Sequence, residues 1–180
     1  MTAYSTTVRA THLLTNAAWF GGSLMGAVAL NPAAREGDDA HERAEIADEG
    51  WNRWGPVQGA AIGLHLLSGI AIVADNRRRV VAHPPTTAAV ILKTALTGVA
   101  VAASAAAYRF GGELGDALER ADRDAAARRE ARSLATRMRW LQWATPAATA
   151  GLLVLDAYLG EQQRGVAGLL DRATRVVHRS

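Results

Sequence analysis

Residues 54–74 read WGPVQGAAIGLHLLSGIAIVA and contain no Asp, Glu, Lys or Arg. A helix of about 20 mainly apolar residues is long enough to cross the hydrocarbon core of a bilayer. A soluble helix of that length carries charged residues along its wet face. This stretch therefore predicts a membrane-spanning helix.

Three further stretches contain one charged residue or none. Residues 10–34 have no charged side chain, residues 80–108 contain only Lys93, and residues 140–160 contain only Asp156. We therefore expect an all-α polytopic membrane protein. Residues 1–180 would form one membrane domain, an antiparallel bundle of four transmembrane helices at about 8–30, 54–74, 86–108 and 140–160. A soluble four-helix bundle is the alternative, because alanine is only weakly apolar.

The composition excludes several classes of site and partner. The chain has no Cys, which rules out disulfides, thiol catalysis and cysteine-ligated metals. The sequence pI near 9.9 would suit a nucleic-acid partner. The arginines, however, flank the apolar stretches, which is the pattern of a membrane protein. We expect a lipid bilayer as the partner and no nucleic acid.

The distribution of arginine predicts the orientation. Arg77, Arg78 and Arg79 lie in the short loop after the second span, and the tail after residue 160 is also rich in arginine. The loop after the first span is acidic, with Glu or Asp at positions 36, 38, 39, 42, 45, 48 and 49. The positive-inside rule then places both termini in the cytoplasm and the chain in the inner cell membrane. The eight arginines of residues 109–139 oppose this orientation, although six acidic residues are interleaved with them.

Two segments outside the spans have helical patterns. Residues 113–139 carry the i,i+4 pairs Asp116–Arg120, Glu119–Arg123 and Asp124–Arg128, each with the acid first, which supports a helix. We expect one extramembrane helix there, continuing into the fourth span. The tail has an apolar side and arginines elsewhere, which predicts a C-terminal interfacial helix. Its apolar side consists of Val166, Leu169, Leu170, Ala173 and Val177.

Each predicted span has one polar face. Polar groups facing lipid are costly, so these faces should turn inward. The resulting buried polar cluster is expected to contain His12, Asn16, His65, Lys93, Thr97, Thr149 and Asp156.

The depths of the ionisable residues follow from the helical rise of about 1.5 Å per residue. With Val8, Ala74, Thr86 and Gly160 at the inner surface, His12 and Asp156 lie about 6 Å deep, Lys93 about 10 Å and His65 about 14 Å. All four fall in the inner half of the bundle. Because Lys93 and Asp156 differ by only about 4 Å in depth, we expect them to form an ion pair.

Histidines suggest two other kinds of site. His12 and His65 could provide axial ligands for a haem between facing helices. Their depths, however, differ by about 8 Å, which would tilt the macrocycle. A hydrogen-bonded core histidine is the simpler interpretation of each. Near His41, an N-cap at Asp39 with Glu42 explains the acidic cluster better than a metal site does. No metal and no resident cofactor are predicted, and no catalytic residues can be named.

Glycines recur every four residues in two spans, at Gly22 and Gly26 and at Gly55, Gly59 and Gly63. Small residues at this spacing let membrane helices approach closely. We expect these two glycine faces to pack on one another. Homodimerisation through them is the competing interpretation.

A resemblance to known families rests on short motifs. His12, the run Ala18-Trp19-Phe20-Gly21-Gly22 and Asn31-Pro32 are similar to the first helix of copper-resistance-D-like and anthrone-oxygenase-like membrane proteins. A fuller pattern resembles small four-span membrane proteins of high-GC bacteria. It consists of Trp54-Gly55-Pro56, Asn76-Arg77, Lys93-Thr94-Ala95-Leu96-Thr97 and Gly160-Glu161-Gln162-Gln163-Arg164. The resemblance implies a membrane fold but no activity, and it transfers no functional residue.

Three functional hypotheses remain open. The first is a non-catalytic accessory subunit or small-molecule-binding protein, with another membrane protein or a second copy as partner. The second is a haem-binding or oxygenase-like redox enzyme using His12 and His65. The third is an ion or proton pathway using Lys93 and Asp156.

Overall fold

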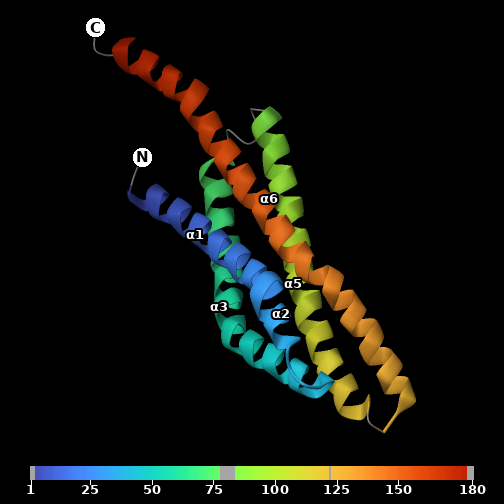
Figure 1. Cartoon of the computed structure of the whole chain (residues 1–180). Coiled ribbons are helices and arrows are strands. Elements are labelled where there is room, and N and C mark those ends of the chain that lie inside the picture. The colour runs from blue at the N-terminus through green and yellow to red at the C-terminus, as the bar shows by residue number, and fades with distance from the viewer. Residues whose placement is uncertain (1–2, 78–83, 122, 178–180) are drawn as a thin grey trace.

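The structure, a computed structural model, describes the backbone of residues 3–77, 84–121 and 123–177 and the side chains of residues 4–77, 84–121 and 123–160. It is helical, with no strand in these ranges, so the all-α prediction is confirmed. The elements, in chain order, are α1 (Ala3–Met25), η1 (Gly26–Leu30), α2 (Asn31–Ala34), α3 (Ala40–Asp75), α5 (Pro84–Ala121) and α6 (Ala125–Val177) (Figure 1).

The long helices form an elongated antiparallel bundle. Helix α1 packs against α3 and α6, and α5 lies along α6, whereas α3 and α5 share a smaller contact. The start of α1, the end of α3 and the start of α5 lie toward one end of the bundle, which we call the terminal end (Figure 1). The end of α2 and the end of α5 lie toward the opposite end, which we call the hairpin end.

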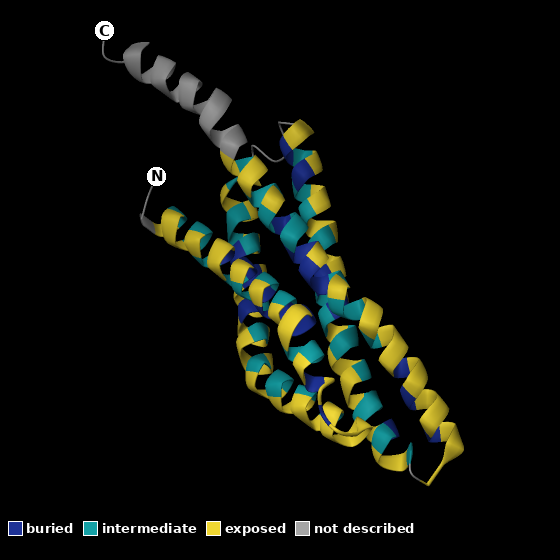
Figure 2. Cartoon of the chain, in the orientation of Figure 1, coloured by how far each residue is buried: buried dark blue, intermediate teal, exposed yellow. Residues whose placement is uncertain are grey.

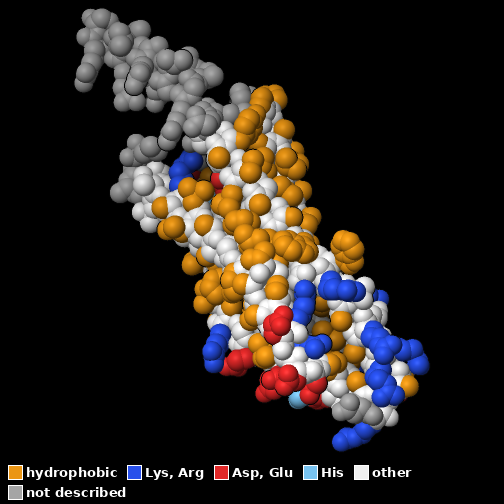
Figure 3. All heavy atoms as spheres, in the orientation of Figure 1, with side chains coloured by type: hydrophobic (Ala, Val, Ile, Leu, Met, Phe, Trp, Pro, Cys, Tyr) orange, Lys and Arg blue, Asp and Glu red, His pale blue; other side chains and the backbone are white. Residues whose placement is uncertain are grey.

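Three helical stretches among the described residues are long and apolar enough to cross a membrane: Tyr4–Ala34, Ala40–Asp75 and Pro84–Ala121. Large apolar side chains cover their outer surfaces, and buried residues are confined to the contacts between helices (Figure 2). Charged side chains gather at the hairpin end, while the middle of the bundle is covered by apolar side chains on the face in view (Figure 3). This distribution is that of a membrane-embedded protein.

A π-helical turn joins α1 to α2. The N–H of Asn31 bonds to the carbonyl of Gly26, five residues back, and Pro32 follows without an N–H of its own. Such π-turns inside helices insert one extra residue and re-aim the side chains that follow. Here Asn31 is directed across the bundle, where its amide bonds to Gln142 on α6.

Helix α3 begins with the N-cap predicted from the sequence. Asp39 Oδ1 accepts hydrogen bonds from the backbone N–H groups of His41 at 2.8 Å and Glu42 at 2.9 Å. The N–H donors of Glu42 and then His41 lower the pKa of Asp39 below its ordinary value. The carboxylate of Glu42 in turn accepts from the N–H of Asp38. His41 therefore belongs to a capped helix start.

The extramembrane helix predicted for residues 113–139 is instead a helical hairpin. Helix α5 continues to Ala121, and α6 starts at Ala125, where Asp124 Oδ1 accepts from the N–H of Ala126 at 2.8 Å. The prediction was wrong because the i,i+4 pair Glu119–Arg123 spans the turn, so charge spacing alone did not reveal the break. The hairpin has its own small core of Ala117, Ala131 and Leu134. The expected continuity of α6 through residue 140 is confirmed.

The two glycine faces do not pack on one another, contrary to the prediction. Gly22 lies against the indole of Trp54 and Gly26 against that of Trp51. The positions of Gly55, Gly59 and Gly63 face open space. The reason is the rotation of α3 about its axis. The inward face of α3 carries Trp51, Trp54, Ala61 and His65. Each of the three glycines comes one residue after a half-buried residue and is therefore turned about 100° away from it.

The predicted C-terminal interfacial helix lies outside the residues whose side chains are described. The backbone is helical as far as Val177.

We predict that Gly22→Leu destabilises the chain by about 1–3 kcal/mol, because a side chain there meets the ring of Trp54 and overpacks the α1–α3 contact. The matched control is Gly59→Leu, which gains the same helix propensity but meets no atom within 4 Å. Unfolding in mixed detergent micelles, followed by circular dichroism, measures both. Equal effects of the two variants would contradict the assigned packing, and loss of a dimer in Gly59→Leu would support the homodimer interpretation instead.

Candidate functional site

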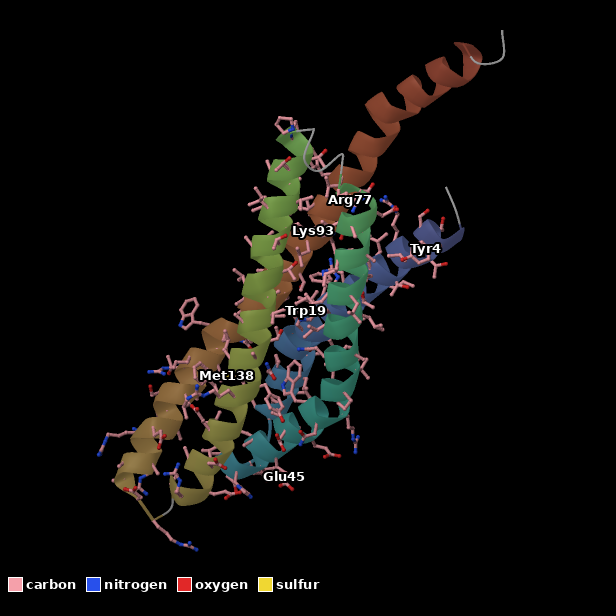
Figure 4. All side chains as sticks on the ribbon, turned by 180° about the vertical axis from the view of Figure 1, so that it is seen from behind. Tyr4, Trp19, Glu45, Arg77, Lys93 and Met138 are labelled. Atoms are coloured by element: carbon pink, nitrogen blue, oxygen red, sulfur yellow. The ribbon has the colours of Figure 1, made fainter. Side chains whose placement is uncertain are left out.

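Inside the bundle, near the terminal end, one lysine joins three helices. Lys93 on α5 forms an ion pair with Oδ1 of Asp156 on α6. Its ammonium also lies 2.8 Å from Nε2 of His12 on α1. The side chains of Lys93 and Asp156 are only 16% and 12% exposed. The predicted pairing of Lys93 with Asp156 is confirmed, and Lys93 points into the bundle rather than into lipid (Figure 4).

The hydrogen bonds determine which nitrogen of His12 carries its proton. Nδ1 lies 3.0 Å from the carbonyl oxygen of His65, which can only accept, so Nδ1 is the N–H donor. Nε2 then offers its lone pair to the ammonium of Lys93. The result is a continuous chain in which Lys93 donates to both Asp156 and a neutral His12.

His12 and His65 are stacked, with ring centroids 4.0 Å apart and an interplanar angle of 16°. Nδ1 of His65 lies 3.3 Å from the carbonyl oxygen of His12, which makes the contact between the two helices reciprocal. Gly69 leaves room for the ring, because a Cβ at that position would lie 3.2 Å from Cε1 of His12. Both histidines are buried.

This stacking corrects the predicted depths. The estimated offset of about 8 Å between His12 and His65 is wrong, since the two rings touch. The estimate aligned Val8 with Ala74, whereas the contacts pair His12 with His65 and Gly26 with Trp51. The antiparallel register therefore differs by several residues, and each residue shifts the depth by about 1.5 Å.

The arrangement does not suit a haem between the two histidines. Both ring nitrogens of His12 already have protein partners, and the rings lie face to face at van der Waals distance. Axial ligation would require both rings to turn. Haem ligation stays a prediction that this geometry does not favour, and it can be checked by the absorption spectrum of the purified protein.

Ser68 also touches His12, a contact that sequence spacing did not reveal. Oγ of Ser68 lies 3.0 Å from Nδ1 of His12, but the hydroxyl donates to the carbonyl of Leu64 at 2.6 Å. Nδ1 of His12 is itself a donor, so it cannot take a proton from Ser68. The pair is therefore not a nucleophile and its base in this arrangement.

The contacts of Lys93 with Asp156 and His12 form the first polar layer of the interior, and a second polar layer lies toward the hairpin end. Trp19 is fully buried and donates from Nε1 to Oγ of Ser104 at 3.1 Å, and Ser104 lies 3.5 Å from Oγ1 of Thr145. The indole also meets His65 edge to face, with ring centroids 5.9 Å apart. Figure 4 shows Trp19 on the side of Lys93 that faces the end carrying Glu45.

A third polar layer lies farther toward the hairpin end. Oδ1 of Asn31 accepts from Nε1 of Trp51 at 3.1 Å, while its Nδ2 donates to Oε1 of Gln142 at 3.0 Å. Sequence reasoning missed Trp19, Ser68 and Asn31 as polar contacts. For Trp19 and Ser68 the available signal was a position one helical turn from a predicted cluster residue, whereas Asn31 is directed inward by the π-turn, which the sequence did not predict.

The remaining predicted cluster residues lie between the first two layers. Thr97 is half-buried and Thr149 fully buried, and both hydroxyls donate to carbonyls of their own helices. Asn16 is also fully buried. Its Oδ1 and Nδ2, together with Oδ2 of Asp156, have no hydrogen-bond partner in the described part of the chain.

At the terminal end a shallow, open cleft lies between α1 and α3. Its polar lining residues are Tyr4, Ser5, Arg9, Asp75 and Asn76. Val8, one helical turn before His12, completes the wall nearest the cluster. No group of three or more His, Asp or Glu side chains suited to a metal ion occurs among the described residues.

Comparison with known proteins found no matching family model, no matching curated protein and no matching solved structure. The resemblance to copper-resistance-D-like and anthrone-oxygenase-like proteins therefore stays an expectation.

We predict that Lys93→Met and Asp156→Leu each destabilise the chain by about 3 kcal/mol, because either change leaves an uncompensated charge inside the bundle. The double variant should cost less than the two single variants together. A double-mutant cycle in mixed micelles measures this coupling. The control is the exposed pair Arg109–Glu113, whose coupling should stay below about 1 kcal/mol. Additive effects for Lys93 and Asp156 would contradict the pairing.

Proposed function

We propose that this chain is a four-span protein of the cell membrane, with both termini in the cytoplasm, and that its internal cluster conducts protons. The observation that carries this proposal is the unbroken contact of Asp156, Lys93 and His12 inside the bundle. An ionisable residue at membrane depth is expensive and commonly marks an ion or proton pathway. Here three such residues from three helices touch in series.

The fourth span is supported by the way α6 is turned. Its polar residues Thr145 and Thr149 are buried, and Asp156 pairs inward. Its exposed large side chains between residues 140 and 160 are Trp140, Trp143, Val154 and Tyr158. Between residues 140 and 160, these three polar side chains therefore face the interior, while an apolar and aromatic surface is left for lipid.

Polar groups follow one another along the interior of the bundle. The cleft beside Arg9 and Asp75 opens at the terminal end, one turn from His12. The layers of Lys93, then Trp19 with Ser104, then Asn31 with Gln142 continue to the hairpin end. Hydroxyls and imidazoles both accept and donate hydrogen bonds, which suits stepwise proton transfer, whereas the indole of Trp19 only donates and the amides of Asn31 and Gln142 can orient neighbouring groups.

An accessory role is the second candidate. It rests on the hairpin end, where exposed arginines of α6 offer a surface for a partner protein. These are Arg128, Arg129, Arg132, Arg137 and Arg139.

We predict that the purified full-length chain in liposomes moves protons when a potassium diffusion potential is applied, as reported by a pH-sensitive dye inside the vesicles. Asp156→Asn and His12→Gln should lower this flux to that of protein-free vesicles, because each removes a proton carrier while keeping similar volume. His41→Gln is the matched control, since His41 lies at the capped start of α3 and should leave the flux unchanged.

Flux that is unchanged in both cluster variants would rule out the proton pathway. A well-folded wild-type chain without any flux would do the same and would favour the accessory role.

A further inference from the structure

Asn16 is the buried polar residue whose role the cluster does not explain. It lies one turn after His12 and one turn before Trp19 on α1, and all three are buried on the same face. Its amide offers one acceptor and two donor hydrogens. None of them has a partner in the described part of the chain, although the residue is 0% exposed.

The level of Asn16 in the bundle can be fixed from the contacts on either side. Toward the terminal end is the layer of His12 and Lys93, and toward the hairpin end is the layer of Trp19 and Ser104. Between these layers, α5 presents Thr97 and α6 presents Thr149. Asn16 therefore lies at a level where two more helices carry hydroxyl groups.

The hydroxyls of this level have lone pairs to offer. Oγ1 of Thr97 donates to the carbonyl of Lys93 at 2.9 Å, and Oγ1 of Thr149 donates to the carbonyl of Thr145 at 2.8 Å. Their protons are thus in use, whereas a hydroxyl oxygen has two acceptor sites. Oδ2 of Asp156 is a further acceptor without a partner among the described residues.

We propose that Asn16 holds one internal water molecule between the first and second polar layers. A buried amide without hydrogen bonds is costly, and internal waters commonly satisfy such groups with two to four hydrogen bonds. Water both donates and accepts, so it can satisfy the amide oxygen and the amide hydrogens as well as neighbouring lone pairs.

The proposed water has a function that rests on the proposed proton pathway. It continues the chain from Lys93 and His12 toward Ser104 and Thr145. A proton arrives on a lone pair of the water, and a different proton leaves from one of its O–H bonds, so the water is regenerated. Without it, proton transfer stops at the first layer.

The experiment compares two substitutions in the full chain in liposomes. Asn16→Leu has similar size and excludes water, whereas Asn16→Ala removes the amide but leaves space for water. Infrared difference spectra in water and in ¹⁸O-labelled water report the O–H stretch of internal water, and the dye assay reports flux. Ser23→Ala is the control, because Ser23 is a buried hydroxyl of α1 that donates to the carbonyls of Trp19 and Phe20 on its own helix.

The expected result is an isotope-sensitive water band in the wild type, in Ser23→Ala and in Asn16→Ala, and its loss in Asn16→Leu. Flux should fall to the protein-free level in Asn16→Leu and be partly retained in Asn16→Ala. A band that persists in Asn16→Leu would overturn the water site. An Asn16→Leu variant that melts at a higher temperature than the wild type and conducts equally well would also overturn the water site. That result would mean that the Asn16 amide of the wild type has no hydrogen-bond partner.

The two proposals fail in different ways. A wild-type chain that shows no flux but loses the water band in Asn16→Leu refutes the proton pathway and supports the water site. If Asn16→Leu does not fold, the spectra of the wild type and of Ser23→Ala decide, since the absence of an isotope-sensitive water band in both overturns the site.

Discussion

An ammonium group inside a membrane bundle must have its hydrogen bonds satisfied by other parts of the protein, because lipid provides none. In this chain Lys93 meets that constraint with a carboxylate from α6 and an imidazole from α1. The same contacts fix how three helices are rotated about their axes. Because Nε2 of His12 accepts from Lys93, its Nδ1 donates to the carbonyl of His65 on α3. Helix α3 is thereby joined to the other three helices. Lys93 donates hydrogen bonds to Asp156 and to His12, and His12 donates in turn to the carbonyl of His65.

The sequence was sufficient to predict features that depend on local composition. Long runs without charge predicted the helices, and the polar positions at helical spacing predicted which faces turn inward. The ion pair of Lys93 with Asp156 followed from the energetic need to pair two charges in an apolar setting, which leaves few alternatives. The N-cap at Asp39 was also predictable, because its residues are adjacent in the chain.

Features that depend on how helices slide and turn against one another could not be predicted. The stacking of His12 on His65 depends on a register between α1 and α3 that apolar sequence does not encode. The indoles of Trp51 and Trp54 take the space beside Gly26 and Gly22 that a second glycine helix was expected to fill. Helix α5 ends at Ala121 and α6 begins at Ala125 with neither Gly nor Pro between them, so the one local signal of the break is Asp124, whose carboxylate caps the start of α6.

The π-turn of η1 makes the first helix one residue longer than an unbroken α-helix would need between Trp19 and Asn31. Each residue of an α-helix turns the chain by about 100°. Deleting one residue within η1 would let the segment run as an unbroken α-helix and keep Asn31 directed at Trp51 and Gln142, because the wider π-turn takes up the rotation of one extra residue. A second extra residue would instead turn Asn31 by about 100° away from both partners. Among related chains, a one-residue deletion between Trp19 and Asn31 should therefore occur together with loss of the π-turn, whereas a one-residue insertion should not be tolerated there.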